Sequence, residues 1–200
     1  MKLYDFPFAP NPRKLRVYLA EKGIEVPLVQ VNIVKGEQRT PEFLAKNPLG
    51  KLPVLELDDG TLLTESLAII HYFEELYPEP PMIGVTPLER AQVRRLEQIA
   101  YNSVLSQVAR CFHASKALLP GATPNAAIAD AARAELPQPL ALLNHEIGDR
   151  PFIAGERPSI ADCTLFATFK LAEMAEIDLA PGSNLARWYE AFSQRPSAAA

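Results

Sequence analysis

The sequence predicts an α/β domain followed by an all-helical domain. Strand-like and helix-like stretches alternate up to about residue 80, whereas alanine-rich helical patterns without strand signals continue from there to the end. Four prolines fall in the stretch 77–87 between these halves, and a helix cannot run through them. We therefore expect a domain at 1–78, a linker at 79–86 and a helical domain at 87–200.

The first domain begins with a strand, predicted at 2–6, and a helix. A turn with three prolines follows the strand. We expect Asn11 to be the N-cap of the helix, because Pro12 suits the first helical position, and we expect Gly23 to end the helix.

The remaining elements complete the order βαβαββα. The stretch 58–60 reads Asp-Asp-Gly, and Asp-Gly supplies the positive φ angles of a tight hairpin turn. We expect the second strand at 26–34 and a short helix at 41–46. The two hairpin strands are predicted at 52–57 and 61–63, and the closing helix begins at about residue 65.

The second domain is predicted to contain at least four helices. Ser159 and Asp162 have the spacing of a capping box, which fixes the start of a helix locally and has a structural role. The predicted helices are 87–118, 124–148, 159–176 and 182–195.

Composition excludes several classes of function. The 200 residues carry a net charge of −4 and no apolar run of membrane-spanning length, so the sequence favours neither nucleic acid nor a membrane as partner. The first residues do not resemble a signal peptide. Cys111 and Cys163 form no CxxC pair, and the three histidines have no metal-ligand spacing. We expect a cytoplasmic protein without a metal.

The first helix carries cations at the end that its dipole makes positive. Arg13, Lys14 and Arg16 lie in or near its first turn, where each cation costs about 0.3–1 kcal/mol unless an anion is near. Two interpretations stay open: an anionic ligand at this helix end, or a solvated basic face.

Two further segments could contact a ligand. Pro53 opens a predicted strand, and a cis bond after Leu52 would turn the backbone of Leu52 outward to pair with a bound peptide. Glu65 and Ser66 lie at a predicted helix start, where such residues are also ordinary caps.

These segments together resemble the thioredoxin-like domain of cytosolic glutathione transferases. The matching stretches are RKLRV at 13–17, AEKG at 20–23, NPLGKLP at 47–53 and TESLAII at 64–70. The helical half is also similar to this family, in FIAG at 152–155, SIAD at 159–162 and WYEAFSQRP at 188–196. The resemblance implies a thioredoxin-like domain of order βαβαββα and an all-α C-terminal domain.

The resemblance also implies how glutathione binds. Glu65 and Ser66 would hold the γ-glutamyl amine and carboxylate, and Leu52, before a cis-Pro53, would pair with the cysteinyl unit. Lys51 would reach the glycyl carboxylate. Weaker candidates for that contact are Lys35 and Gln38.

The first turn departs from the family pattern. Members usually place a Tyr, Ser or Cys there to meet the glutathione sulfur, but the stretch 6–12 contains none of these, and Ala9 lies where a serine is common. Asn11 is the candidate donor, through its amide nitrogen. His113 matches a histidine of a branch thought to use an ordered water, although Ala109 lies where that branch has a serine.

The acceptor substrate is expected between the first turn and the first long helix of the second domain. An apolar stripe on that helix could be core or could wall the site. The predicted acceptor residues are Phe8, Tyr101, Leu105, Val108 and Phe112.

The predicted function is therefore a dimeric detoxification enzyme. It would transfer the thiolate of glutathione, a co-substrate, to small, mostly apolar electrophiles without any other cofactor. Alternatives are a non-catalytic glutathione-binding or regulatory protein and a specialised glutathione-dependent isomerase, dehalogenase or peroxidase.

Overall fold

A four-stranded mixed sheet organises the first domain of the computed structural model, which describes residues 1–116 and 123–200. The strand order is β2-β1-β3-β4, with β1 and β2 parallel and the other two pairs antiparallel. The predicted order βαβαββα is confirmed, with an additional 3₁₀ turn at Glu37–Arg39. The strands are β1 (Lys2–Asp5), β2 (Leu28–Gln30), β3 (Val54–Glu56) and β4 (Leu62–Thr64).

β1, β2 and β3 are shorter than predicted, and β4 has the predicted length but begins one residue later. β2 ends at Gln30, although the pattern extended to residue 34, because Asn32 turns the chain: its Oδ1 accepts from the amides of Val34 and Lys35, both at 3.1 Å. This turn leads the chain away from the sheet, so that Ile33 and Val34 lie near the N-terminus of α1.

Helix α1 (Pro10–Lys22) begins earlier than predicted. Its N-cap is Ala9, and no side chain caps it, so the prediction of Asn11 as N-cap is wrong. The first turn tolerates two prolines because the amide hydrogens they lack have no partner within the helix. Gly23 ends α1 as expected, with φ 66° and the amide of the next residue bonded to Leu19 O at 2.9 Å.

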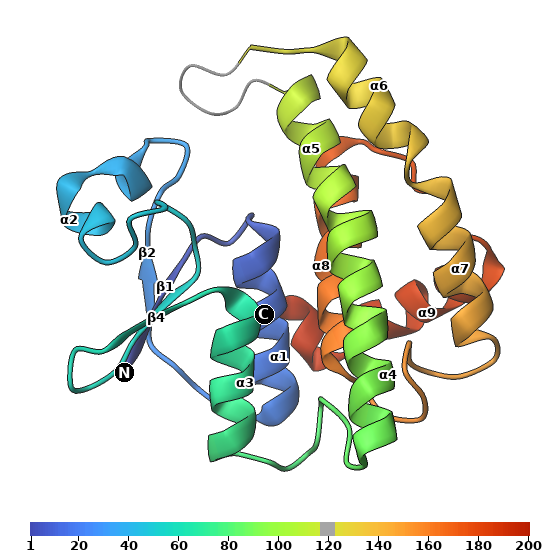
Figure 1. The fold of residues 1–200 in the computed structure, drawn as a ribbon, viewed down its shortest axis with the longest axis horizontal. Coiled ribbons are helices and arrows are strands. Elements are labelled where there is room, and N and C mark those ends of the chain that lie inside the picture. Colours follow the sequence, from blue (N-terminus) through green and yellow to red (C-terminus); the bar gives the residue numbers. More distant parts are fainter. Residues whose placement is uncertain (117–122) are drawn as a thin grey trace.

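Two hydrophobic clusters cover the faces of the sheet. On one face, Phe43 of α2 (Pro41–Leu44) packs with Tyr4, Val31 and Val54. On the other, α1 and α3 (Ser66–Leu76) lie between the sheet and the helical domain (Figure 1). The larger cluster runs without interruption from this face into the helical domain.

The helical domain begins with one long helical path interrupted by a wider turn. α4 (Pro87–Gln98) passes into a π-helix at Ile99–Leu105 and then into α5 (Ser106–Ser115). The predicted helix 87–118 thus follows this path, and its residues 117 and 118 lie outside the described residues.

The predicted helix 124–148 is wrong as a single element. It consists of α6 (Ala126–Ala134) and α7 (Pro137–Ile147), because Pro137 cannot donate within a continuous helix and instead starts a new one. The other predicted helices are present, as α8 (Ile160–Ala175) and α9 (Ser183–Ser193).

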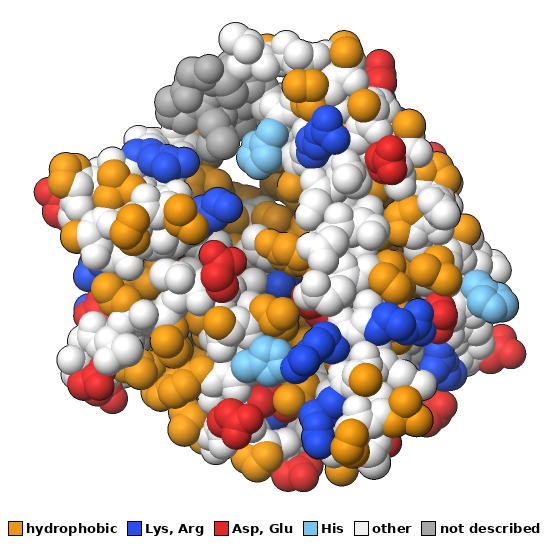
Figure 2. Space-filling view, in the orientation of Figure 1, with side chains coloured by type: hydrophobic (Ala, Val, Ile, Leu, Met, Phe, Trp, Pro, Cys, Tyr) orange, Lys and Arg blue, Asp and Glu red, His pale blue; other side chains and the backbone are white. Residues whose placement is uncertain are grey.

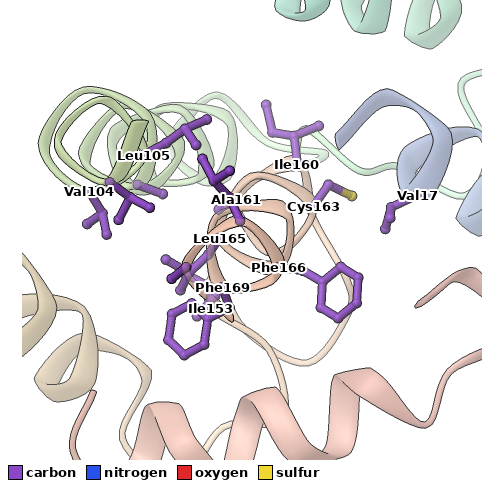
Figure 3. Packing of buried hydrophobic residues seen from close by; sticks show 14 of the residues in the cluster. Val17, Val104, Leu105, Ile153, Ile160, Ala161, Cys163, Leu165, Phe166 and Phe169 are labelled. Atoms are coloured by element: carbon purple, nitrogen blue, oxygen red, sulfur yellow. The ribbon is translucent and has the colours of Figure 1, made fainter. Parts of the chain in front are cut away.

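Helix α8 is the centre of the helical domain and is buried along most of its length. Val17 of α1 lies on one side of it, and Val104 and Leu105 lie on the other (Figure 3). The predicted capping box is confirmed: the Asp162 carboxylate accepts from Ser159 and also from Trp188 Nε1 at 2.9 Å. Because α1 packs directly on α8, the start of α1 has a fixed place beside the helical domain.

Candidate active site

A polar pocket of about 340 Å³ lies where the start of α1 meets the helical domain. Figure 2 shows this face hollowed between the two halves of the molecule. The pocket brings together segments that are far apart in the sequence. Its lining includes Asn11, Gln38, Lys51, Leu52, Pro53, Glu65, Ser66, Tyr101 and His113.

The loop before β3 has a rigid shape. Asn47 Nδ2 donates to Lys51 O at 2.8 Å, and Asn47 Oδ1 accepts from the Leu49 amide at 3.1 Å. Gly50 has φ 59°, and a Cβ there would lie 2.8 Å from Gln38 O, so a side chain does not fit. The loop therefore holds its pocket-facing backbone in one conformation.

The predicted cis bond between Leu52 and Pro53 is present. Among residues 1–116 and 123–200, the amide and carbonyl of Leu52 have no hydrogen-bond partner. Because the residue lines the pocket, these two groups can pair with the main chain of a bound peptide.

The start of α3 provides an exposed carboxylate and a buried hydroxyl. Glu65 has φ 65°, which is unfavourable for a residue with a side chain, and it makes no capping bond to α3. Ser66 is buried, and its Oγ lies 3.5 Å from Asn11 Oδ1. The interpretation of these residues as ordinary side-chain caps is therefore wrong for Glu65, and both line the pocket.

The lining of the pocket contains further polar groups. Lys51 is exposed at the rim, while Gln38 is buried, with an Oε1 that has no partner among the described residues. Arg39 also lines the pocket, which the sequence reasoning missed. Lys35 does not line it.

The cations at the start of α1 have partners inside the protein, so the interpretation as a solvated basic face is wrong. The interpretation as the site of an anionic ligand stays a prediction. Arg16 pairs with buried Asp5 and donates to Pro7 O at 2.9 Å, and Arg13 donates to the same carbonyl at 3.1 Å. Lys14 is buried beside Glu97. Sequence reasoning missed these contacts because both carboxylates come from other elements.

A second, apolar pocket of about 230 Å³ adjoins the first. Of the predicted acceptor residues, Phe8 and Phe112 line it, Tyr101 lines the polar pocket instead, and Leu105 and Val108 lie in the core. Sequence reasoning missed other walls, which come from the residue after β1, from the chain after β2 and from α8. They are Phe6, Ile33, Val34, Leu171 and Met174.

The two pockets meet at the N-terminus of α1. Ala9, Pro10, Ile33, Ala109 and His113 line both of them. His113 packs against Phe112, with the ring centroids 5.3 Å apart, and partial burial lowers the pKa of His113 below its ordinary value. The imidazole of His113 therefore lies at the junction of the two pockets.

Other classes of site are not found in the part of the chain that the structure describes. Residues 1–116 and 123–200 contain no cluster of His, Cys, Asp and Glu that could hold a metal ion. Within the same residues, no helix is long and apolar enough to span a membrane.

The structure thus joins a sheet domain with a cis-proline loop to a helical domain, and a polar and an apolar pocket lie side by side where they meet. Residues 3–81 match the family "Glutathione S-transferase, N-terminal domain", and residues 126–191 match "Glutathione S-transferase, C-terminal domain". The chain belongs to the glutathione S-transferase family. It is a glutathione transferase and it binds glutathione.

Individual relatives cover almost the whole chain. Glutathione S-transferase 2 of Saccharomyces cerevisiae is 35% identical, covering 98% of this chain and 87% of the yeast protein. The crystal structure of Gtt2 from Saccharomyces cerevisiae superposes with a TM-score of 0.91 at 35% identity, covering 98% of each chain. A maleylacetoacetate isomerase of Pseudomonas aeruginosa is 33% identical, covering 86% of this chain and 82% of that protein.

Proposed function

We propose that this transferase adds the thiolate of glutathione to an electrophilic carbon of small, uncharged, apolar compounds. The observation that carries the proposal is the meeting of the polar and apolar pockets at Ala9, Pro10 and His113. With glutathione in one pocket and the acceptor in the other, the reacting atoms would be held together at this junction.

The polar pocket supports the proposed binding of the tripeptide. Glu65 and Ser66 would hold the γ-glutamyl amine and carboxylate. Leu52 would pair through its free amide and carbonyl with the cysteinyl unit, and cis-Pro53 would fix that backbone. Lys51 would reach the glycyl carboxylate. Gln38 Oε1, buried and unpartnered among the described residues, would accept from an amide of the ligand.

Activation of the thiol is assigned to the start of α1 rather than to a Tyr, Ser or Cys of the first turn. Lowering a thiol pKa from about 8.5 to about 6.5 requires about 2.7 kcal/mol. A helix N-terminus contributes about 0.3–1 kcal/mol, and one hydrogen bond to a charged acceptor about 1.5–3 kcal/mol. The α1 terminus and the amide of Asn11 would together suffice, with neutral His113 as a proton acceptor or a partner for water.

The reaction would proceed without a covalent enzyme intermediate. The thiol proton leaves to His113 or to water, and the sulfur lone pair forms the bond to the acceptor carbon. In a haloalkane or chloronitroaromatic compound the halide leaves with the electron pair of its bond to that carbon, and in an activated alkene the π pair of the C=C bond takes up a proton from water. The protein would contribute charge stabilisation and positioning. Phe8 and Phe112 would hold the acceptor, while buried Leu105 and Val108 would support the helix behind them.

Isomerisation is the second candidate, because a maleylacetoacetate isomerase is among the relatives. Such a substrate carries carboxylates, which would need cationic partners. The residues that line the apolar pocket include neither Lys nor Arg. The pocket therefore favours an uncharged acceptor over a dicarboxylate.

The decisive experiment measures the ultraviolet absorbance of the thiolate in the glutathione complex across pH. A bound thiol that ionises near neutral pH supports the transferase mechanism. A thiol that titrates as in free solution, although glutathione binds, would favour a non-catalytic or regulatory role. A substrate panel of chloronitroaromatics, haloalkanes, hydroperoxides, disulfides and maleylacetoacetate then tests the acceptor class.

The assembly, location and domain limits are further parts of the proposal. By resemblance to the family we infer a cytoplasmic homodimer, with a glutathione-binding domain at 1–78, a linker at 79–86 and a helical domain at 87–200. Sedimentation of the purified chain tests the dimer, and limited proteolysis within 79–86 tests the boundaries.

A further inference from the structure

A buried ion pair lies directly behind the wall of the polar pocket. The side chain of Lys14 is 1% exposed, its Nζ lies 3.6 Å from Glu97 Oε1, and Thr164 Oγ1 donates to the same oxygen at 3.2 Å. Burial lowers the pKa of Lys14, and the carboxylate of Glu97 opposes that effect. Removing two charges from water is unfavourable, so an apolar pair would pack here at no greater cost. Stability of the core therefore does not explain why two charged residues are buried at this place.

The ammonium of Lys14 faces an aromatic ring that belongs to the pocket. Its Nζ lies 4.6 Å from the centroid of the Tyr101 ring, and Tyr101 lines the polar pocket. Lys14 follows Asn11 by three residues on α1, so the two lie on one face of that helix. The Tyr101 ring therefore borders the face of α1 to which the glutathione thiol is assigned.

The backbone at Tyr101 has an uncommon geometry. Tyr101 belongs to the π-helix Ile99–Leu105, and its carbonyl accepts from the amide of Ser106, and from Ser106 Oγ at 2.9 Å. π-Helical turns are rare and occur frequently at functional sites. This one widens the helix where it passes α1.

The hydroxyl of Tyr101 is available to a ligand. In residues 1–116 and 123–200 it makes no hydrogen bond, whereas the hydroxyls of Tyr4, Tyr18 and Tyr189 each donate to a glutamate. The hydroxyls of Tyr72 and Tyr77 also have no partner there, but neither residue lines the polar pocket. A phenol that lines a pocket with its donor unused can serve whatever anion binds there.

We propose that Tyr101 is a second thiolate donor, supplied by the helical domain, and that Lys14 is a positioning residue that acts through it. The phenol O–H donates to the glutathione thiolate. The ammonium under the ring holds the ring in place and draws electron density from it, which strengthens that donor. The tyrosine forms and breaks no covalent bond. This inference rests on the proposed function of the pocket.

Other charged groups around the pocket act on the same thiolate. They are Glu97 of α4 behind Lys14, Glu65 at the start of α3, and Lys51 and Arg39 in the loops, and the titratable His113 of α5 also faces the pocket. None of them is changed in the first test, so the difference between variants isolates the phenol hydroxyl.

The first test compares Tyr101→Phe with Tyr72→Phe, a partly buried tyrosine of α3 that lines neither pocket. Tyr101→Phe keeps the ring over Lys14. We expect it to raise the pKa of bound glutathione by about one to two units and to lower kcat, with little change in the Kd of glutathione. An unchanged pKa, with or without weaker binding, overturns the proposal. Tyr72→Phe should change neither quantity.

The second test concerns Lys14. The double variant Lys14→Met/Glu97→Gln removes both charges, so that no buried charge is left alone, and it is made with and without Tyr101→Phe. With Tyr101 present, we expect the thiol pKa to rise by about half a unit or more. In the Tyr101→Phe background, the same double change should have no further effect, because Lys14 acts through the hydroxyl. Equal effects in the two backgrounds overturn the positioning role.

Failure of this inference is distinguishable from failure of the proposed function. If glutathione bound to the unaltered protein titrates as in free solution, the proposed function fails. If its pKa is lowered and Tyr101→Phe leaves it lowered, only the role of Tyr101 fails.

Discussion

Ser66 Oγ donates to Asn11 Oδ1 across 3.5 Å, and this contact joins the start of α3 to the first turn of α1. Because the oxygen of the Asn11 amide faces Ser66, its nitrogen is directed away from α3. Both residues line the polar pocket. The residue proposed to hold the γ-glutamyl carboxylate therefore orients the residue proposed to meet the thiol.

Asn11→Ala should impair thiol activation without destabilising the fold. We expect the pKa of bound glutathione to rise by about one to two units, because one hydrogen bond to a charged acceptor is lost. The midpoint of thermal unfolding should stay nearly constant, since Asn11 does not cap α1. Spectroscopic titration of the bound thiol and thermal melting measure the two quantities.

Asn11→Asp is the control for this prediction. It keeps the shape of the side chain but places a like charge beside the thiolate. A donor role predicts a severe loss of turnover. If the Asn11→Asp variant is fully active, the thiolate is stabilised by the α1 amides, by Tyr101 or by a water near His113 and not by Asn11.

Glu65→Gly should weaken glutathione binding while leaving the protein at least as stable. Glu65 has φ 65°, a conformation that glycine adopts without a steric penalty. Loss of the carboxylate should raise the Kd of glutathione about tenfold or more. Urea unfolding and isothermal titration calorimetry test the two effects.

Glu176→Gly is a matched control, because Glu176 also has a positive φ, 58°, but lies at the end of α8 and lines neither pocket. It should change stability in the same direction and leave glutathione binding unchanged. If the Glu65→Gly protein binds glutathione normally, Glu65 has no role in glutathione binding and is a surface residue with a strained backbone.

Features that depend on neighbouring residues could be predicted from the sequence. Gly23 ends α1, Ser159 and Asp162 form their capping box, and the bond before Pro53 is cis. The helix end and the capping box follow from the conformational preferences of one or two residues, whereas the cis bond was indicated by a proline at the opening of a strand. The order of strands and helices was predictable for the same reason, since alternation and turn residues are local signals.

Features that depend on distant partners could not be predicted. Arg16 and Lys14 of α1 pair with Asp5 and Glu97, whose approach depends on the assembled fold. Leu171 and Met174 wall the apolar pocket from α8, although their apolar character alone is equally typical of core. The N-cap of α1 could not be predicted because Pro10 and Pro12 both suit the first turn of a helix, and the helix begins at the earlier proline.

Stability at acid pH should depend on Glu56. A hydrogen bond from Tyr4 and ion pairs with Lys2 and Lys46 lower the pKa of Glu56 to about 2. The unfolded chain therefore binds more protons between about pH 4.5 and 2, and the contribution of Glu56 is lost as the pH falls through that range. Urea unfolding of Glu56→Gln should show a weaker loss of stability from pH 5 to 2 than the unaltered protein.

Glu25→Gln serves as the comparison, because Glu25 is an exposed glutamate without an ion pair among the described residues. Its unfolding profile should parallel that of the unaltered protein. If both variants show the same acid profile, the interactions of Glu56 do not contribute to stability.

The apolar pocket should make turnover depend on the length of an apolar acceptor. Phe8, Val34 and Met174 are exposed large hydrophobic side chains that also line this pocket, so they extend it toward solvent. For a series of straight-chain 2-alkenals, kcat/KM should rise by up to about fourfold per methylene until the pocket is filled, because burying a CH₂ contributes about 0.8 kcal/mol.

Met174→Gln should reduce this increase per methylene, because the amide replaces apolar surface at the pocket mouth with a group that must stay hydrated. The pKa of bound glutathione should not change, since Met174 does not line the polar pocket. Leu142→Gln, on an exposed hydrophobic residue of α7 outside both pockets, is the control and should leave the increase intact. Steady-state kinetics across the alkenal series measures the dependence of kcat/KM on chain length. If kcat/KM of the unaltered enzyme does not depend on chain length, the acceptor binds somewhere other than the apolar pocket.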